Sequence, residues 1–238
     1  MSMVSKRFAR LIDLSAVQAN HSERDVREVA AFALEQEIIA VHVLPCWVPL
    51  LRTLLPKGGK TLVGAPIGFP GGAHVTDIKV AEATRLVADG AEEVDMVMNI
   101  AQALSGDFDY VAADIAAVVS AVAPTPVKVI LECHYLDEAL IRRCCDVAIA
   151  SGAVWIKTAT GWAESGATAA NVAIIADQVR ARVGIKAAGG VRTLDDVRDF
   201  YRKGVRRFGI SLATTRNLLN RLDQSPEIFP ELADVTAA

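Results

Sequence analysis

Aromatic residues are scarce in this chain of 238 residues, at 5% of the total, although hydrophobic residues make up 52%. The core must therefore be built mainly from Ala, Val, Leu and Ile. No apolar stretch approaches the roughly 18 residues that a membrane-spanning helix needs. The N-terminus carries Lys6, Arg7 and Arg10 without a following apolar block, which excludes a signal peptide of the usual pattern. We therefore expect no membrane partner.

An excess of basic charge is also absent, since the formal net charge is -3. This balance gives no global field for nucleic acid, so no nucleic-acid partner is expected. The chain lacks paired cysteine motifs, and the adjacent Cys144 and Cys145 do not have metal-ligand spacing. We interpret the four cysteines as reduced core thiols of a cytoplasmic protein. The histidines at 21, 42, 74 and 134 are scattered, so no metal site is predicted.

Short β-like runs alternate with alanine-rich helical stretches along the whole chain. The predicted strands are residues 8–14, 38–43, 61–65, 93–98, 127–132, 154–158, 183–187 and 207–211. Eight β/α units predict a parallel (β/α)8 TIM barrel over residues 1–238 as a single domain. The alternative, an open doubly wound sheet, is disfavoured because no G-x-G-x-x-G follows an early strand.

The sequence predicts where three of the helices begin. Residues typical of a helix start occur at Ser22, which is followed by acidic residues, at Thr76 and at Thr193. Gly90 and Gly204 follow two of these helices at positions typical of a C-terminal stop. The polar end of the chain, residues 233–238, is a candidate for disorder.

Two lysines end short apolar strands. Lys157 closes residues 154–158, and Lys186 lies in residues 184–190. An ammonium beside a low-dielectric core favours the neutral amine, and a second ammonium nearby pushes its pKa further down. A neutral lysine amine is a nucleophile that forms Schiff bases with carbonyl substrates. The alternative is that each lysine extends from its strand end into water.

In such barrels the active site lies at the C-terminal ends of the strands. The side chains at the predicted ends are Asp13, Ser15, His42, residues 95–99, Glu132, residues 157–160, Lys186 and Ser211. Asp95 lies within a largely apolar strand, where an acid is costly unless it is paired. It is a candidate for a proton relay beside a lysine, with a structural ion pair as the alternative. For Glu132 a functional and a structural role both stay open.

A glycine-rich loop, Gly189-Gly190-Val191-Arg192-Thr193, follows the seventh predicted strand and precedes a helix. Glycine lets the backbone approach a ligand closely, and N–H groups at a helix start favour an anion. Barrels often bind phosphate after strands seven and eight. Gly209 and Ser211 at the last strand would complete such a pocket. The alternative is a tight turn without a ligand.

Five stretches together resemble the deoxyribose-phosphate aldolase family. They are residues 68–73 (GFPGGA), 93–97 (EVDMV), 127–132 (VKVILE), 155–161 (WIKTATG) and 185–193 (IKAAGGVRT). The likeness extends over residues 11–219. It implies a class I aldolase on a TIM barrel that cleaves 2-deoxyribose 5-phosphate to glyceraldehyde 3-phosphate and acetaldehyde.

The resemblance also implies roles for individual residues. Lys157 would form the Schiff base, Lys186 would lower its pKa and Asp95 would act in a proton relay. The residues that would line the phosphate and sugar site are Gly161, Gly189, Gly190, Arg192, Gly209 and Ser211. Thr160 and Ser15 would be supporting hydroxyls. No cofactor is implied, because the lysine supplies the covalent chemistry.

The chain departs from the usual pattern of that family at several positions, among them Leu44, Ala159 and Leu212. They motivate an alternative, a related class I aldolase with a different aldehyde pair or a weaker phosphate requirement. A further alternative from another class is a non-catalytic barrel that binds a sugar phosphate. Alanine-rich helical faces are compatible with a homodimer or a larger homo-oligomer.

Overall fold

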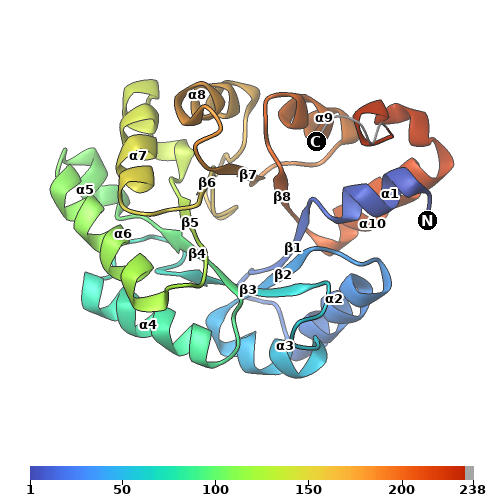
Figure 1. Ribbon diagram of the computed structural model, residues 1–238, viewed down its shortest axis with the longest axis horizontal. Coiled ribbons are helices and arrows are strands. Elements are labelled where there is room, and N and C mark those ends of the chain that lie inside the picture. Colours follow the sequence, from blue (N-terminus) through green and yellow to red (C-terminus); the bar gives the residue numbers. More distant parts are fainter. Residues whose placement is uncertain (234–238) are drawn as a thin grey trace.

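Eight parallel strands close into a barrel in the computed structural model, which describes residues 1–233 (Figure 1). The strands, in chain order, are β1 Ile12–Ala16, β2 Ala40–Val43, β3 Leu62–Ile67, β4 Glu93–Val97, β5 Val127–Ile130, β6 Trp155–Lys157, β7 Gly184–Ala188 and β8 Arg207–Ile210. Each strand pairs with the next, and β8 pairs with β1. The predicted TIM barrel is confirmed.

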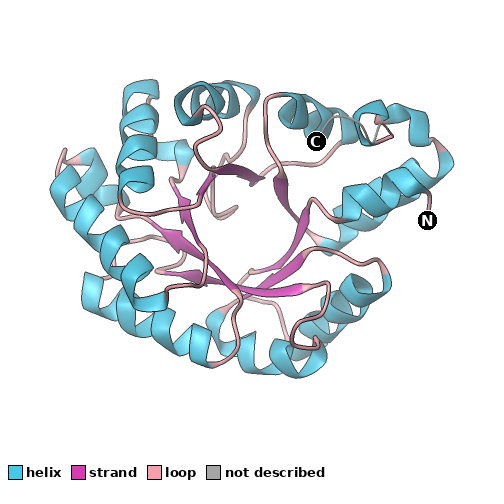
Figure 2. Ribbon diagram, in the orientation of Figure 1, coloured by secondary structure: helices cyan, strands magenta, loops and turns pink. Residues whose placement is uncertain are grey.

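Helices surround the strands, so that Figure 2 shows a magenta ring of strands inside a cyan ring. They are α1 Met3–Ala9, α2 Glu23–Glu35, α3 Val48–Leu54, α4 Thr76–Ala88, α5 Ile100–Leu104, α6 Phe108–Val122, α7 Glu138–Ala150, α8 Ala169–Val179, α9 Leu194–Arg202 and α10 Leu212–Gln224. Short 3-10 turns add Pro45–Trp47, Cys133–Tyr135, Pro226–Ile228 and Pro230–Leu232. No helix of the described residues 1–233 has the length and apolar character that a membrane crossing needs.

The predicted helix starts are confirmed at α2, α4 and α9. Ser22 precedes α2, and its backbone N–H donates to the Asp25 carboxylate at 2.7 Å. Thr193 caps α9 in the same reciprocal way with Asp196. These contacts satisfy N–H groups that have no partner within the helix.

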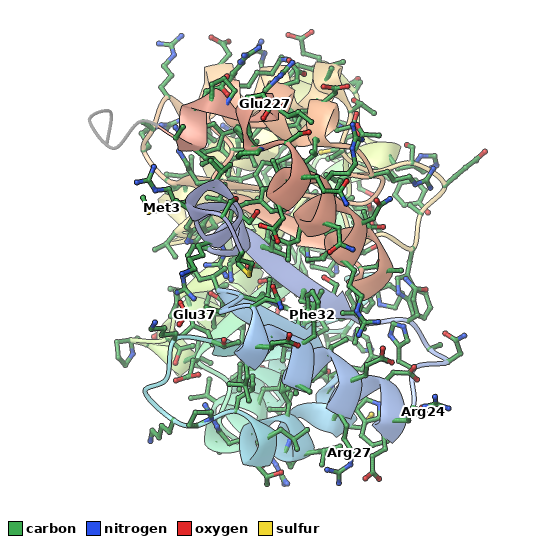
Figure 3. The ribbon with its side chains drawn as sticks, turned by 90° about the vertical axis from the view of Figure 1, so that its right-hand side faces the viewer. Met3, Arg24, Arg27, Phe32, Glu37 and Glu227 are labelled. Atoms are coloured by element: carbon green, nitrogen blue, oxygen red, sulfur yellow. The ribbon has the colours of Figure 1, made fainter. Side chains whose placement is uncertain are left out.

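The prediction for the first strand is wrong at its start. Residues 8–14 were expected to be extended, but α1 runs to Ala9 and β1 begins at Ile12. Ser2 caps α1 by accepting the Ser5 N–H at 3.1 Å, and Phe8 packs edge-on against Phe229. Apolar residues at this spacing fit a helix face as well as a strand, and tertiary packing decides between them. Figure 3 shows α1, marked by Met3, on the side of the molecule that α2 and α10 also occupy.

Two further expectations concern cysteine and the chain end. All four cysteines are free, but Cys46 is exposed, so the interpretation of all four as core thiols is wrong for that residue. Ala233 is described, and its N–H donates to the Pro230 carbonyl at 2.9 Å. The rest of the segment that was a candidate for disorder, residues 234–238, lies outside the described residues.

The register of the strands positions the site. Lys157 pairs with Lys186 across β6 and β7, Lys186 pairs with Arg207 across β7 and β8, and Asp95 pairs with Lys128 across β4 and β5. Residues that are paired in register point to the same face of a sheet. These charged side chains therefore share the inside of the barrel, while apolar side chains pack between the strands and the helices.

Candidate active site

One carboxylate joins the two predicted lysines. Oδ2 of Asp95 lies 2.8 Å from Lys157 Nζ and 2.7 Å from Lys186 Nζ. The two nitrogens are therefore no farther apart than these two distances together. All three side chains are buried, and only Lys157 keeps measurable exposure, at 7%. The alternative, in which each lysine extends from its strand end into water, is wrong for both.

Further charges lie against this triad inside the barrel. The Asp13 carboxylate on β1 lies 2.5 Å from Lys186 Nζ and accepts a hydrogen bond from the guanidinium of Arg207. On β4, Oε1 of Glu93 lies 2.7 Å from a guanidinium nitrogen of Arg207 and 2.8 Å from Lys128 Nζ. With Asp95 and Lys157 included, the interior holds three carboxylates and four basic side chains. The positive and negative charges become equal in number when one of the four basic side chains is neutral. A buried cluster is less costly when each of its charges has a partner of opposite sign.

The lowered pKa of Lys157 makes it the side chain that gives up its proton as the pH rises toward 8. Burial, with Lys186 adding to it, lowers the pKa of Lys157 to about 8 against the opposing attraction of Asp95. Burial alone would lower the pKa of Lys186 too, but the Asp13, Asp95 and Glu93 carboxylates raise it above its ordinary value. Burial would raise the pKa of Asp95, yet the basic side chains around it lower it well below its usual range. Lys157 is thus the amine available for nucleophilic attack near neutral pH.

A cavity of about 250 Å³ opens above Lys157 at the C-terminal ends of the strands. Ten of the eleven residues expected at the site line it, namely Ser15, Asp95, Lys157, Thr160, Gly161, Gly189, Gly190, Arg192, Gly209 and Ser211. The eleventh, Lys186, is fully buried and reaches the cavity only through Asp95. This geometry places Lys186 behind Lys157, away from the cavity.

Glycine is required where the loop after β7 meets its neighbours. Gly189 has φ +78°, in the left-handed region, and a Cβ added there would lie 3.1 Å from Gly166 Cα. A Cβ at Gly209 would lie 2.8 Å from the Ala188 Cβ and 3.5 Å from Lys186 Cε. Both positions keep the backbone open beside the start of α9, where N–H groups favour an anion.

The start of α10 contributes the other side of this anion pocket. Ser211 Oγ caps the helix and lies 3.1 Å from the Thr214 hydroxyl, and both residues line the cavity. Leu212 instead lines a neighbouring hollow beside Glu28 and Arg216. A hydroxyl at position 214 therefore lies in the pocket where Leu212 offers none.

Glu132 supports the loop after β6. Its backbone is left-handed, with φ +56°, and its carboxylate accepts the Thr160 N–H at 3.1 Å and the Thr160 hydroxyl. Thr160 in turn accepts the Trp162 N–H, and the Trp162 indole donates to the Val17 carbonyl at 3.0 Å. Phe69 packs edge-on against Trp162 at 5.6 Å. Glu132 thus holds the loop that spans the cavity mouth.

Sequence reasoning missed several residues of the site. Glu93, Lys128 and Arg207 were not considered as candidates, while Asp13 and His42 were considered as strand ends without a role. All five are buried around Asp95. A usable signal was present: each is a charged or polar residue inside an otherwise apolar strand, where burial without a partner is costly.

Fold and site together define a (β/α)8 barrel whose cavity holds a buried lysine amine suited to covalent chemistry. The model of the DeoC/LacD family aldolases matches residues 9–218. A deoxyribose-phosphate aldolase from Klebsiella pneumoniae subsp. pneumoniae is 56% identical over 98% of this chain and 94% of its own. One from Sinorhizobium medicae is 48% identical over 94% and 91%. The solved structure of QR15, an aldolase, has a TM-score of 0.86 at 32% identity, covering 96% of this chain and 99% of QR15.

The chain belongs to the DeoC/LacD family of aldolases. The resemblance drawn from the five sequence stretches is confirmed.

Proposed function

We propose that the chain cleaves 2-deoxy-D-ribose 5-phosphate to D-glyceraldehyde 3-phosphate and acetaldehyde through a Schiff base on Lys157. One observation carries this assignment: a buried amine with a pKa of about 8 shares a carboxylate oxygen with a second lysine at the floor of an open cavity. The names of the relatives support the substrate. With that pKa, about a tenth of Lys157 is a free amine at pH 7.

The first half of the reaction forms the imine. Lys157 Nζ attacks the C1 aldehyde of the open-chain sugar, and the carbinolamine loses water to give an iminium ion. Asp95 lies 2.8 Å from the attacking nitrogen and accepts its proton or passes it on. Lys186, on the same oxygen, supplies the compensating positive charge.

The second half breaks the carbon–carbon bond. A base in the Asp95 relay takes the proton of the C3 hydroxyl, the C2–C3 bond breaks, and its electron pair moves to the iminium nitrogen. Glyceraldehyde 3-phosphate leaves, and an enamine remains on Lys157. Protonation at carbon and hydrolysis by water release acetaldehyde and restore the amine. The scheme uses no cofactor, since the lysine supplies the covalent step.

The phosphate is assigned to the pocket between the starts of α9 and α10. Gly189, Gly190 and Gly209 leave room for backbone N–H donors, and Arg192 adds a positive charge at the rim. Hydroxyls of Ser211 and Thr214 complete the polar lining.

The test is a retro-aldol assay that compares 2-deoxyribose 5-phosphate with free 2-deoxyribose, run beside cyanoborohydride trapping and peptide mapping. We expect turnover of the phosphorylated sugar and a reduced adduct on Lys157. An adduct on Lys186 alone would reverse the roles. Absence of any adduct would favour the non-catalytic sugar-phosphate-binding barrel.

The sequence also suggested a second aldolase function, with another aldehyde pair or a weaker phosphate requirement, because Ala159 and Leu212 lack hydroxyls where relatives were expected to have them. Neither residue lines the cavity, and Thr214 supplies a hydroxyl there, so the pocket gives this second function less support than the first. The same assay separates the two functions, because the second predicts similar kcat/KM for both sugars or turnover of neither. The predicted cytoplasmic location and homo-oligomeric state stay predictions, the latter open to light scattering in solution.

A further inference from the structure

A buried imidazole lies beside Asp95 and has no part in the scheme above. His42 on β2 is 2% exposed, and its ring lines the floor of the cavity. Its Nε2 lies 3.2 Å from Oδ1 of Asp95, the oxygen that the two catalytic lysines do not use. The neighbouring strand makes room for the ring, because a Cβ at Gly64 would lie 2.4 Å from Nε2.

The surroundings of the ring determine its protonation. Nε2 is flanked by Oδ1 of Asp95 at 3.2 Å and Oε1 of Glu93 at 3.4 Å, and ionised carboxylates only accept hydrogen bonds. The proton must therefore be on Nε2. The charged groups around the ring are Asp13 on β1, Glu93 and Asp95 on β4, and Lys186 on β7, with Lys128 on β5 and Arg207 on β8 bound to the same carboxylates. Burial lowers the pKa of His42 below its ordinary value, which leaves the ring neutral in the working range.

A metal ligand is the obvious alternative role for His42. Ligand atoms of Asp13, His42 and Glu93 lie within 4.8 Å of one another. Both carboxylates are already engaged, Asp13 by Lys186 and Arg207, and Glu93 by Lys128 and Arg207. A divalent cation would have to displace these buried cations, so the cluster favours a hydrogen-bonding role for the ring.

We propose that His42 is a positioning residue for the aldolase reaction: its Nε2–H holds one oxygen of Asp95 so that the other stays between Lys157 and Lys186. The proposal rests on the proposed function of those three residues. Lys128 Nζ, also 3.2 Å from Oδ1, shares that oxygen. His42 differs from Lys128 because it supplies an N–H without adding a charge, so it orients the carboxylate and leaves the charge balance of the interior intact.

Removing the donor has a defined consequence. A carboxylate that loses a hydrogen bond becomes a stronger partner for the ammonium form of Lys157. The acidic limb of the rate profile should then move to higher pH, and the relay should lose its alignment. The His42→Leu variant has a neutral side chain without a donor, so its kcat should fall about ten- to a hundredfold and its KM should change little. That range of about ten- to a hundredfold corresponds to the loss of one hydrogen bond to a charged group.

Two amide variants discriminate between positioning and general packing. In His42→Gln the side-chain amide nitrogen reaches the place of Nε2, so it keeps an N–H donor and cannot titrate. It should restore most of the turnover and the acidic limb of the unmodified enzyme. In His42→Asn the amide nitrogen reaches only the place of Nδ1, which faces Asp13 at 3.9 Å. This variant should behave like His42→Leu although it resembles Gln in polarity.

Gly64 provides an independent test that leaves His42 unchanged. The methyl group in Gly64→Ala should displace the ring from Asp95 and reproduce the shifted acidic limb. In a His42→Leu background the same change should add no shift, because the donor is already gone, and this coupling is measured by a double-mutant cycle.

The deciding experiment measures kcat and kcat/KM on 2-deoxyribose 5-phosphate across pH for the unmodified enzyme and all five variants, with trapping on acetaldehyde and thermal unfolding of each. Rescue by Gln but not by Asn, with a shifted limb in Leu, supports the positioning role. Equal loss in all three His42 variants, or an unchanged limb in Leu, overturns it and makes the ring a packing element. Failure of the unmodified enzyme to form an adduct would instead overturn the proposed function.

Discussion

Removing the charge of Lys186 should make Lys157 harder to deprotonate. The two nitrogens share Oδ2 of Asp95 at 2.8 Å and 2.7 Å, which holds them no more than about 5.5 Å apart. Two unit charges at that distance interact by about 3 kcal/mol at an effective dielectric constant of about 20, which corresponds to about two pH units. In Lys186→Met the acidic limb, near pH 8 in the unmodified enzyme, should therefore move up by one to about two pH units.

The assay is the rate of cyanoborohydride trapping of acetaldehyde on Lys157 as a function of pH. Trapping reports the free amine and does not depend on the later proton relay through Asp95, which Lys186 contacts. If the substitution disturbed only that relay, turnover would fall while the trapping profile stayed in place.

Two controls guard against a trivial result. Lys186→Arg keeps the positive charge, so its trapping limb should stay near that of the unmodified enzyme. Lys186→Met leaves the buried Asp13 and Asp95 short of a partner, a change that typically costs 3–5 kcal/mol (about the size of a broken buried pair). Thermal unfolding must therefore show that the variant is folded at the assay temperature. A limb that stays near pH 8 in folded Lys186→Met would refute the reasoning and leave burial as the cause of the lowered pKa.

The other predictions concern the nucleophile and the anion pocket. Lys157→Leu should abolish turnover and raise the free energy of unfolding at pH 7 by up to about 3 kcal/mol, because an amine whose pKa falls on folding destabilises the fold below that pKa; chemical denaturation measures this, and a large loss of stability would contradict it. In the unmodified protein the destabilisation by Lys157 should decrease, and the free energy of unfolding should rise, as the pH increases from about 8 toward the ordinary pKa of lysine. Arg192→Gln should raise KM for the phosphorylated sugar about tenfold or more and leave free 2-deoxyribose unaffected, whereas equal changes would place Arg192 outside the phosphate site. Gly209→Ala should crowd Ala188 and Lys186, so kcat/KM should fall for both sugars; unchanged kinetics would show that the backbone can shift.

Lys157, Lys186 and Asp95 could be predicted as site residues because each interrupts or ends an apolar strand. Burying a charge there is costly unless the charge is paired, so such a residue needs a structural or functional reason. Their placement at one end of the barrel followed from parallel strand order. The glycine loop after β7 could also be predicted, because the residues that form a turn are adjacent in the sequence. Local signals also placed the starts of α2, α4 and α9.

The start of β1 could not be predicted in this way. Phe8 and its neighbours have a spacing that suits either a strand or one face of a helix, and contact with Phe229 near the other end of the chain decides between them. The side chain of Leu212 shows the same limit. Its position after Ser211 suggested a place in the phosphate pocket, but the turn of α10 directs it into a neighbouring hollow and brings Thr214 to the pocket.

By itself the sequence determined the barrel, the pair of lysines with their acid, and the family, because strand spacing and short motifs are local properties of the chain. The tertiary structure supplied the physical reason why the pKa of Lys157 is lowered and that of Lys186 is not. Burial acts on both, but Lys186 is compensated by Asp13 and Glu93 as well as Asp95, and those carboxylates come from strands far apart in the chain. The pKa of a buried group depends on the sum of charges around it in space, and strand register sets that sum.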